Sequence, residues 1–140
     1  MIKKITIFKT LLIAITVFIS GGLNAQCAYD NTAYVTLDPV CGVSTASTAN
    51  AWGGDYIITN VTAGNTYTWS TCGDTDFDTQ LTLYPSGGGA SLAYNDDDCG
   101  TQSTITWTAT FTGIVHLLLD EYDCTSNSTD MTIEVSCTSG

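Results

Sequence analysis

Large apolar residues alternate with small polar ones in short runs along most of the chain. In residues 66–70, for example, Tyr67 and Trp69 alternate with threonine and serine. This alternation puts the apolar side chains on one face of a β-strand, and no segment after residue 25 shows the period of about 3.6 residues that a helix requires. The expected strands are Ala33–Leu37, Asp55–Val61, Thr66–Thr71, Thr79–Tyr84, Ser91–Tyr94, Thr104–Thr110, Ile114–Leu119 and Met131–Ser136. We therefore predict an all-β fold of about eight strands in two packed antiparallel sheets, a β-sandwich.

The cysteines indicate that this sandwich is stapled by disulfides. All six lie after residue 25, and they are Cys27, Cys41, Cys72, Cys99, Cys124 and Cys137. An even number in an exported chain is typical of a disulfide framework, and the absence of a C-x-x-C pair argues against a zinc site. The sequence does not determine the pairing; our expectation is the sequential order 27–41, 72–99 and 124–137. Each bridge would stabilise the fold by about 2–4 kcal/mol.

The first 25 residues have the layout of a secretory signal peptide. Three lysines precede an apolar run at Leu11–Ile19, and Ala25 ends a cleavage site before Gln26. The run is too short for a transmembrane helix, which needs about 20 apolar residues. We predict that residues 1–25 are removed and that the protein is secreted, extracellular or at the cell surface.

The rest of the chain divides into two parts. Residues 26–54 are irregular and form an N-terminal arm with a first strand, while residues 55–140 form the sandwich. The arm packs either on its own domain or onto a neighbouring copy, and the sequence leaves both possibilities open.

The charge of the chain after residue 25 is entirely negative. This part contains 14 Asp and Glu residues and no Lys or Arg. Nucleic-acid binding depends on Lys and Arg that displace counterions, and phosphoryl transfer needs a cationic clamp, so both functions are excluded. An anionic membrane surface would repel the chain, and we expect no membrane insertion after signal cleavage. Each carboxylate must be solvated, hydrogen-bonded or bound to an external cation.

Three acidic clusters fall at the ends of expected strands, in residues 74–78, 95–98 and 120–123. No basic side chain relieves their repulsion, and Ca²⁺ takes about six to eight oxygen ligands, so we predict a structural Ca²⁺ site. The expected ligands are Asp76, Asp78, Asp96 and Asp97, with Asp74, Asn95 and Asp98 as further candidates. The spacing does not match an EF-hand loop, and a solvated acidic surface is the alternative.

Four segments follow one another in a specific order. A first strand is followed by a strand with the pattern D-T-x-L-x-L-Y, a turn with the sequence N-D-D, and a strand with the pattern S-x-I. They are Ala63–Gly73, Phe77–Tyr84, Ala93–Asp97 and Gln102–Trp107. With these residues, the chain from about Gly53 to Val135 resembles the bacterial pre-peptidase C-terminal (PPC) domain.

The resemblance implies a small, exported, non-catalytic, jelly-roll-like β-sandwich of a kind often attached to secreted proteases or adhesins. It also implies that Asp78, Asn95, Asp96 and Asp97 lie near one another and bind calcium in some members. No catalytic or C-terminal sorting domain accompanies the sandwich in this sequence, so the appendage role does not simply transfer to this chain.

A catalytic function is not expected. His116 is the only histidine, and it lies inside an expected strand, where a packed or surface histidine is more common than a catalytic one. The even cysteine count leaves no thiol nucleophile, and no feature raises the pKa of one carboxylate of a pair, as glycoside hydrolysis requires. We predict that the protein is not an enzyme.

Two classes of function remain. The favoured one is a structural module that assembles with itself into a filament or surface layer, because Ile114, His116 and Leu118 form an apolar outer strand face that could contact a neighbouring copy. The alternative is an adhesive or carbohydrate-binding module, with Trp52 as the glycan contact, since Trp69 and Trp107 face the core. The expected partners are the protein itself or an extracellular glycan or protein. Asn60 and Asn127 match the N-glycosylation pattern.

Overall fold

The computed structural model describes residues 26–140. The predicted signal peptide, residues 1–25, lies outside the described residues and stays a prediction. In the part described, no helix combines the length and the apolar character needed to cross a membrane.

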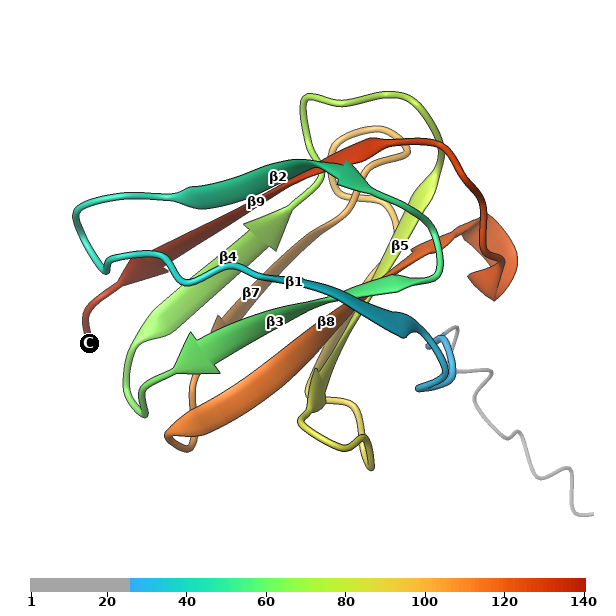
Figure 1. Cartoon of the computed structure of the whole chain (residues 1–140). Coiled ribbons are helices and arrows are strands. Elements are labelled where there is room, and N and C mark those ends of the chain that lie inside the picture. Colours follow the sequence, from blue (N-terminus) through green and yellow to red (C-terminus); the bar gives the residue numbers. More distant parts are fainter. Residues whose placement is uncertain (1–25) are drawn as a thin grey trace, which may run out of the picture.

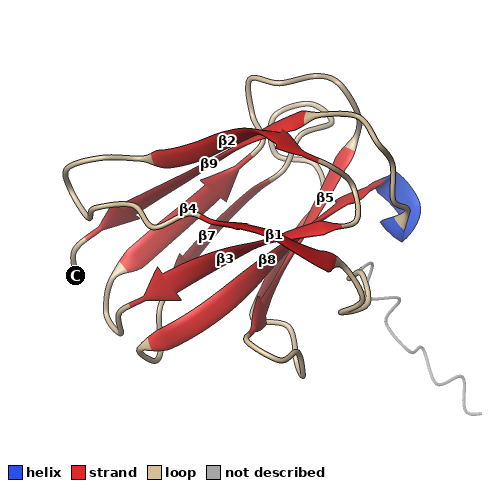
Figure 2. Ribbon diagram, viewed as in Figure 1, coloured by secondary structure: helices blue, strands red, loops and turns tan. Residues whose placement is uncertain are grey.

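Residues 26–140 form nine strands in two sheets. The elements are β1 (Thr32–Thr36), β2 (Ala46–Ala51), β3 (Asp55–Val61), β4 (Thr66–Ser70), β5 (Thr79–Pro85), β6 (Ala93–Asn95), β7 (Thr104–Thr108), β8 (Gly113–Glu121), a 3₁₀ turn η1 (Tyr122–Cys124) and β9 (Met131–Thr138). One sheet has the order β1-β3-β8-β5-β6 and the other β2-β9-β4-β7. Figures 1 and 2 show the sheets as two layers, so the predicted all-β, disulfide-stapled sandwich is confirmed.

The apolar residues of the alternating runs meet between the two sheets. Ile57 of β3 and Leu117 of β8 belong to the same fully buried core as Trp69 of β4 and Ile133 of β9. Along β4 every second residue is buried, as the alternation predicts. The Trp69 indole donates to Thr59 Oγ1 on β3 over 3.1 Å, so a buried hydrogen bond also joins the two layers.

The sequence does not predict β2. Its residues are small, and Ala51 is the one residue of this strand that is fully buried, so no apolar alternation marks it. β2 pairs antiparallel with β9, whereas β1 pairs with β3 in parallel, in contrast to the other strand pairs of residues 26–140. Both strands of the N-terminal arm thus lie in this chain's own sheets.

Residues 27–31 lie on the outer face of the β8 and β5 strands. The Tyr84 hydroxyl donates to the Cys27 carbonyl over 2.7 Å, and the Tyr29 ring packs against Tyr84 and His116. β8 is therefore covered on both faces, and six consecutive residues of it, 115–120, are buried.

The disulfides are Cys27–Cys124, Cys41–Cys137 and Cys72–Cys99. The sequential pairing is therefore right for 72–99 and wrong for the other two. The cause is sheet topology: the loop after β1 lies beside the end of β9, where Gly42 N donates to the Cys137 carbonyl over 2.8 Å. Two cysteines that are 96 residues apart are thereby brought together.

Candidate functional site

Strand order brings most of the carboxylates to one end of the sandwich. β8 ends where β3 and β5 begin, because Leu119 pairs with Asp55 and Glu121 pairs with Thr79. Ser103, just before β7 in the other sheet, donates to the Thr79 carbonyl over 2.6 Å. The corresponding ends of the two sheets therefore adjoin.

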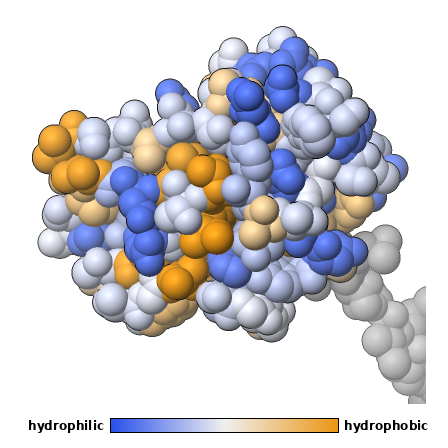
Figure 3. Space-filling model, in the orientation of Figure 1, coloured by the Kyte–Doolittle hydropathy of each residue, from blue (hydrophilic) through white to orange (hydrophobic). Residues whose placement is uncertain are grey.

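We name this end the acidic end and define it by its carboxylates. They are Asp30, Asp55, Asp74, Asp76, Asp78, Asp96, Asp97, Asp98, Asp120, Glu121, Asp123 and Asp130. Of the acidic residues described, the other two are Asp38, after β1, and Glu134, within β9. Figure 3 shows hydrophilic residues gathered at the upper right, over the loop before β5, and apolar residues toward the opposite side. At the opposite end, Val43 is 81% exposed.

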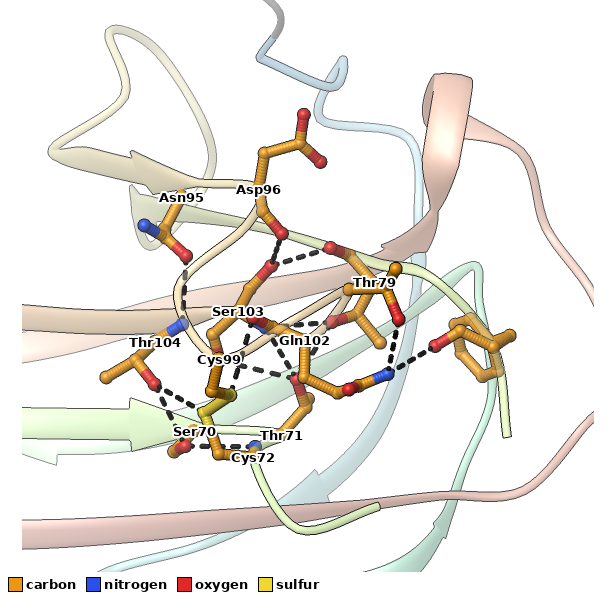
Figure 4. The surroundings of a disulfide bond; sticks show 12 residues. Ser70, Thr71, Cys72, Thr79, Asn95, Asp96, Cys99, Gln102, Ser103 and Thr104 are labelled. Carbon is orange, nitrogen blue, oxygen red and sulfur yellow. Dashed lines mark hydrogen bonds between the residues drawn. A yellow bond between two sulfur atoms is a disulfide. The ribbon is translucent and has the colours of Figure 1, made fainter. Parts of the chain in front are cut away.

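A disulfide and hydrogen bonds hold the loop before β5 against the loop after β6 (Figure 4). Cys72 is bonded to Cys99, and Ser103 Oγ donates to the Asp96 carbonyl. Asn95 Oδ1 accepts from the backbone N–H at the start of β7 over 3.0 Å, so this candidate metal ligand already has a structural partner. The Asp96 carboxylate points away from this network in Figure 4.

Asp78 lies among other carboxylates of these loops, and its pKa is raised. Burial raises its pKa, and so do the negative charges of Asp97, Asp96 and Glu121. Asp78 Oδ1 and Asp96 Oδ1 are buried and have no hydrogen-bond partner. Among residues 26–140, however, no group of three or more His, Cys, Asp or Glu side chains is arranged to hold a metal ion.

The other candidate ligands differ from one another. Asp74 accepts from the backbone N–H of Thr132 over 2.9 Å, which lowers its pKa. Asp76 is exposed, and the neighbouring charge of Asp74 raises its pKa. Asp98 is also exposed. Asp76 and Asp98 are thus open to solvent, whereas Asp74 and Asp78 are partly buried.

The exposed Trp52 belongs to a pocket of about 280 Å³, lined by Tyr34, Asn50, Trp52, Asp55 and Asp130. The Trp52 backbone N–H donates to Asp55 Oδ2 over 2.8 Å, and its indole N–H donates to Asp130 Oδ1 over 2.7 Å. These bonds fix the indole while leaving Trp52 46% and Tyr34 43% exposed. Aromatic rings beside carboxylates can hold a cationic group with an apolar stem, or the face of a sugar.

A second pocket at the acidic end has a volume of about 260 Å³ and is lined by Asp30, Asn31, Thr32, Gly54, Asp120, Cys124 and Ser126. Asp120 is only 3% exposed. Its Oδ1 accepts from Asn31 Nδ2 over 3.0 Å, but its Oδ2 is buried without a partner. Burial, together with the charge of Asp30, raises the pKa of Asp120 to about 6, despite the opposing effect of the Asn31 hydrogen bond.

His116 lies among tyrosines on the outer face of β8. Its ring stacks on Tyr56, with 4.3 Å between centroids, and its Nδ1 is hydrogen-bonded to the Tyr29 hydroxyl. His116 and Leu118 are buried within the chain, and Ile114 is 41% exposed. Of the three expected assembly contacts, Ile114 is thus the one that reaches the surface.

The environment of His116 gives a pH dependence. Burial lowers its pKa below the usual 6.5, so the unfolded chain takes up a proton at higher pH than the folded protein does. The free energy of unfolding should therefore fall as the pH drops below 6.5. We expect the wild type to lose more stability between about pH 7.5 and about pH 5.5 than His116→Phe, which keeps a ring beside Tyr29 and Tyr56 but cannot titrate. Urea unfolding at each pH measures this, and parallel pH profiles would contradict it.

The two glycosylation candidates differ in their contacts. Asn60 is exposed, and its Nδ2 donates to Asp38 Oδ2 over 2.8 Å. Asn127 uses Nδ2 to reach Glu121 Oε2 and accepts from Gly53 N with Oδ1, both over 3.1 Å. A glycan on Asn127 would disturb the loop that carries Trp52, which makes Asn60 the better candidate.

The sequence model of a family described as a domain of unknown function, DUF8695, matches residues 43–139. The chain belongs to the DUF8695 family. No curated protein matches the sequence significantly. The matched part of this DUF8695 protein spans β2 to β9 and most of the acidic end; β1 and Asp30 precede it.

The fold of this DUF8695 protein is similar to that of solved structures. One is Aeromonas hydrophila PliG, a periplasmic lysozyme inhibitor of g-type lysozyme, with 15% identity, 76% of this chain and 99% of that chain covered, and a TM-score of 0.52. Another is the pre-peptidase C-terminal domain of a collagenase from Bacillus anthracis, with 16% identity, coverages of 80% and 98%, and a TM-score of 0.47. The likeness to PliG shows the small β-sandwich that the PPC resemblance implies, and the family match is to DUF8695.

Proposed function

We propose that the protein is an exported, non-catalytic module that binds a cationic protein partner at its acidic end. The observation that carries this proposal is that Asp55 and Asp130 lie beside the exposed rings of Trp52 and Tyr34 at the acidic end, in a chain whose residues 26–140 include no Lys or Arg. Aromatic anchors surrounded by charge are typical of protein-binding surfaces. The three disulfides suit an oxidising compartment outside the cytoplasm.

The pocket at Trp52 supplies the chemistry for such a partner. A lysine or arginine of the partner would lay its aliphatic stem on Trp52 and Tyr34 and direct its charge to Asp55 and Asp130. The other carboxylates would accelerate the encounter. PliG, which shares the fold, is an inhibitor of g-type lysozyme, and this supports a protein as the class of partner.

The test separates the anchor from the surrounding charge. We expect the protein to bind g-type lysozyme or an oligolysine peptide in biolayer interferometry, with an affinity that falls as salt is added. Trp52→Ala should raise the dissociation rate at least about tenfold, because it removes the aromatic anchor that the partner would cover. The exposed pair Asp98→Asn/Asp123→Asn should mainly lower the association rate, by about threefold or more.

The matched control changes the same amount of charge elsewhere. Asp38→Asn/Glu134→Gln removes two charges that lie outside the Trp52 pocket and outside the loops of Asp98 and Asp123, and it should leave both rates closer to those of the wild type than Asp98→Asn/Asp123→Asn does. The proposal fails if neither cationic probe binds, or if the control weakens binding as much as Asp98→Asn/Asp123→Asn does.

A glycan partner is the second candidate, and the Trp52 pocket also favours it. Tyr34 and Trp52 offer ring faces, and Asn50 offers an amide to sugar hydroxyls. Binding to a glycan array that is lost in Trp52→Ala but insensitive to salt would favour this function over capture of a cationic protein.

The predicted calcium site at Asp76, Asp78, Asp96 and Asp97 stays a proposal. The unpartnered oxygens of Asp78 and Asp96 support it, while backbone carbonyls or water would have to complete the ion's coordination.

Self-assembly into a filament also stays a proposal. Its remaining support is the exposure of Ile114 on β8 and of Val43 at the end opposite the carboxylates. Light scattering of the purified protein, with and without Ca²⁺, tests for assembly.

A further inference from the structure

The Asp120 pocket is chemically unlike the Trp52 pocket, and it is not the pocket proposed to hold the partner's side chain. We propose that it binds a hard divalent cation, with Ca²⁺ as the best-fitting ion, between Asp30 of the N-terminal segment and Asp120 at the end of β8. This site is separate from the one predicted at the acidic loops around Asp78.

The first argument is the state of Asp120. Asp120 is only 3% exposed, yet its Oδ2 lacks a hydrogen-bond partner. Burying a carboxylate oxygen without a partner costs free energy, and a bound ion or water is one of the few ways in which a folded protein satisfies such a group. Because residues 26–140 contain no Lys or Arg, the charge that offsets Asp120 has to come from outside this part of the chain.

The second argument is the lining. Asp30, Asn31, Thr32, Asp120 and Ser126 all carry side-chain oxygens. Asn31 Nδ2 lies 3.1 Å from the Asp55 carbonyl, 3.0 Å from the Leu119 carbonyl and 3.0 Å from Asp120 Oδ1. These three acceptors all contact Nδ2, so they fix the orientation of the Asn31 amide without using its Oδ1.

The size and walls of the pocket select the kind of cation. Ca²⁺ accepts six to eight oxygen ligands in flexible geometry, water among them, and a volume of about 260 Å³ has room for an ion with several waters. The pocket has no aromatic or aliphatic wall for the stem of a lysine or arginine, in contrast to the pocket at Trp52.

An ion here would fasten the N-terminal segment to the sandwich. Asp30 follows Tyr29, which covers His116, and Cys27 is bonded to Cys124 in the same region. The ion would therefore reinforce the disulfide in holding residues 27–31 on β8.

The experiment uses the secreted protein after treatment with EDTA and dialysis. Calorimetric titration with CaCl₂ and melting curves with and without Ca²⁺ are recorded for the wild type, Asp120→Asn, Asp123→Asn and Asp78→Asn. Asp123 is exposed and three residues from Asp120, so its variant is a control matched in charge. We expect Ca²⁺ to bind the wild type and raise its melting temperature, and Asp120→Asn to weaken binding at least about tenfold.

The outcomes are distinct. In EDTA, Asp120→Asn should melt at or above the temperature of the wild type, because the amide relieves a buried charge; this shows that the variant is folded. Asp123→Asn and Asp78→Asn should keep the Ca²⁺ response. The proposal is overturned if the wild type does not bind Ca²⁺, if Asp120→Asn binds it as the wild type does, or if Asp78→Asn alone abolishes binding.

Discussion

Replacing Cys27 and Cys124 by alanine should lower the free energy of unfolding by about 4–5 kcal/mol. The two cysteines are 97 residues apart, so their bond removes a large amount of conformational freedom from the unfolded chain. Its loss also frees the segment that bonds to Tyr84 through Cys27 and packs on His116 of β8 through Tyr29. Since small domains are stable by about 5–15 kcal/mol, this loss is between about a third and nearly all of the total stability. Urea denaturation at 25 °C measures the difference.

The short disulfide is the internal control. Cys72 and Cys99 are 27 residues apart, and their replacement by alanine should cost about 3–4 kcal/mol. If removing the short bridge destabilises the protein as much as removing the long one, the stabilisation does not come from restricting the unfolded chain. Peptide mapping without reduction should find Cys27 joined to Cys124.

Replacing Trp69 by alanine should cost about 3–5 kcal/mol, the second large effect we expect. Trp69 is fully buried in β4, and its indole N–H reaches Thr59 Oγ1 in the opposite sheet. The substitution leaves a cavity between the layers and a buried hydroxyl without its partner. Thermal and urea unfolding, followed by near-ultraviolet circular dichroism, report the loss.

Two further variants separate the contribution of the hydrogen bond from that of the buried ring. Trp69→Phe keeps an aromatic ring but removes the donor to Thr59, so it should cost about 1–3 kcal/mol. Trp52→Ala removes a tryptophan that is 46% exposed and should cost less than about 1 kcal/mol. Equal losses at Trp52 and Trp69 would contradict the core position of Trp69.

The strands with large alternating residues could be predicted from the sequence. β3 has the predicted bounds, Asp55–Val61, and β4 differs by one residue, because apolar side chains facing a core leave a period of two. β2 could not be found in this way, since its residues are alanine, serine, threonine and asparagine. Its place is set by pairing with β9, which local sequence does not reveal.

The acidic loops could also be predicted, but the pockets could not. Asn31 and Asp120 are 89 residues apart and meet only through the packing of the N-terminal segment on β8. The same holds for Trp52 and Asp130, which are 78 residues apart. One signal was available for Asp120: continuing the alternation of Ile114, His116 and Leu118 by one step places it on the outer face of the same strand.

The uneven placement of charge has a mechanical consequence. With most of its carboxylates at one pole and exposed valines at the other, the molecule carries a permanent dipole along the sandwich. In the field of an electropositive object it experiences a torque that turns the negative pole forward, whatever its initial orientation. Molecules adsorbed on such an object would stand upright, and they would show to the surrounding medium the loop between β1 and β2, where Asp38 is the one charged residue and Val40 and Val43 are exposed.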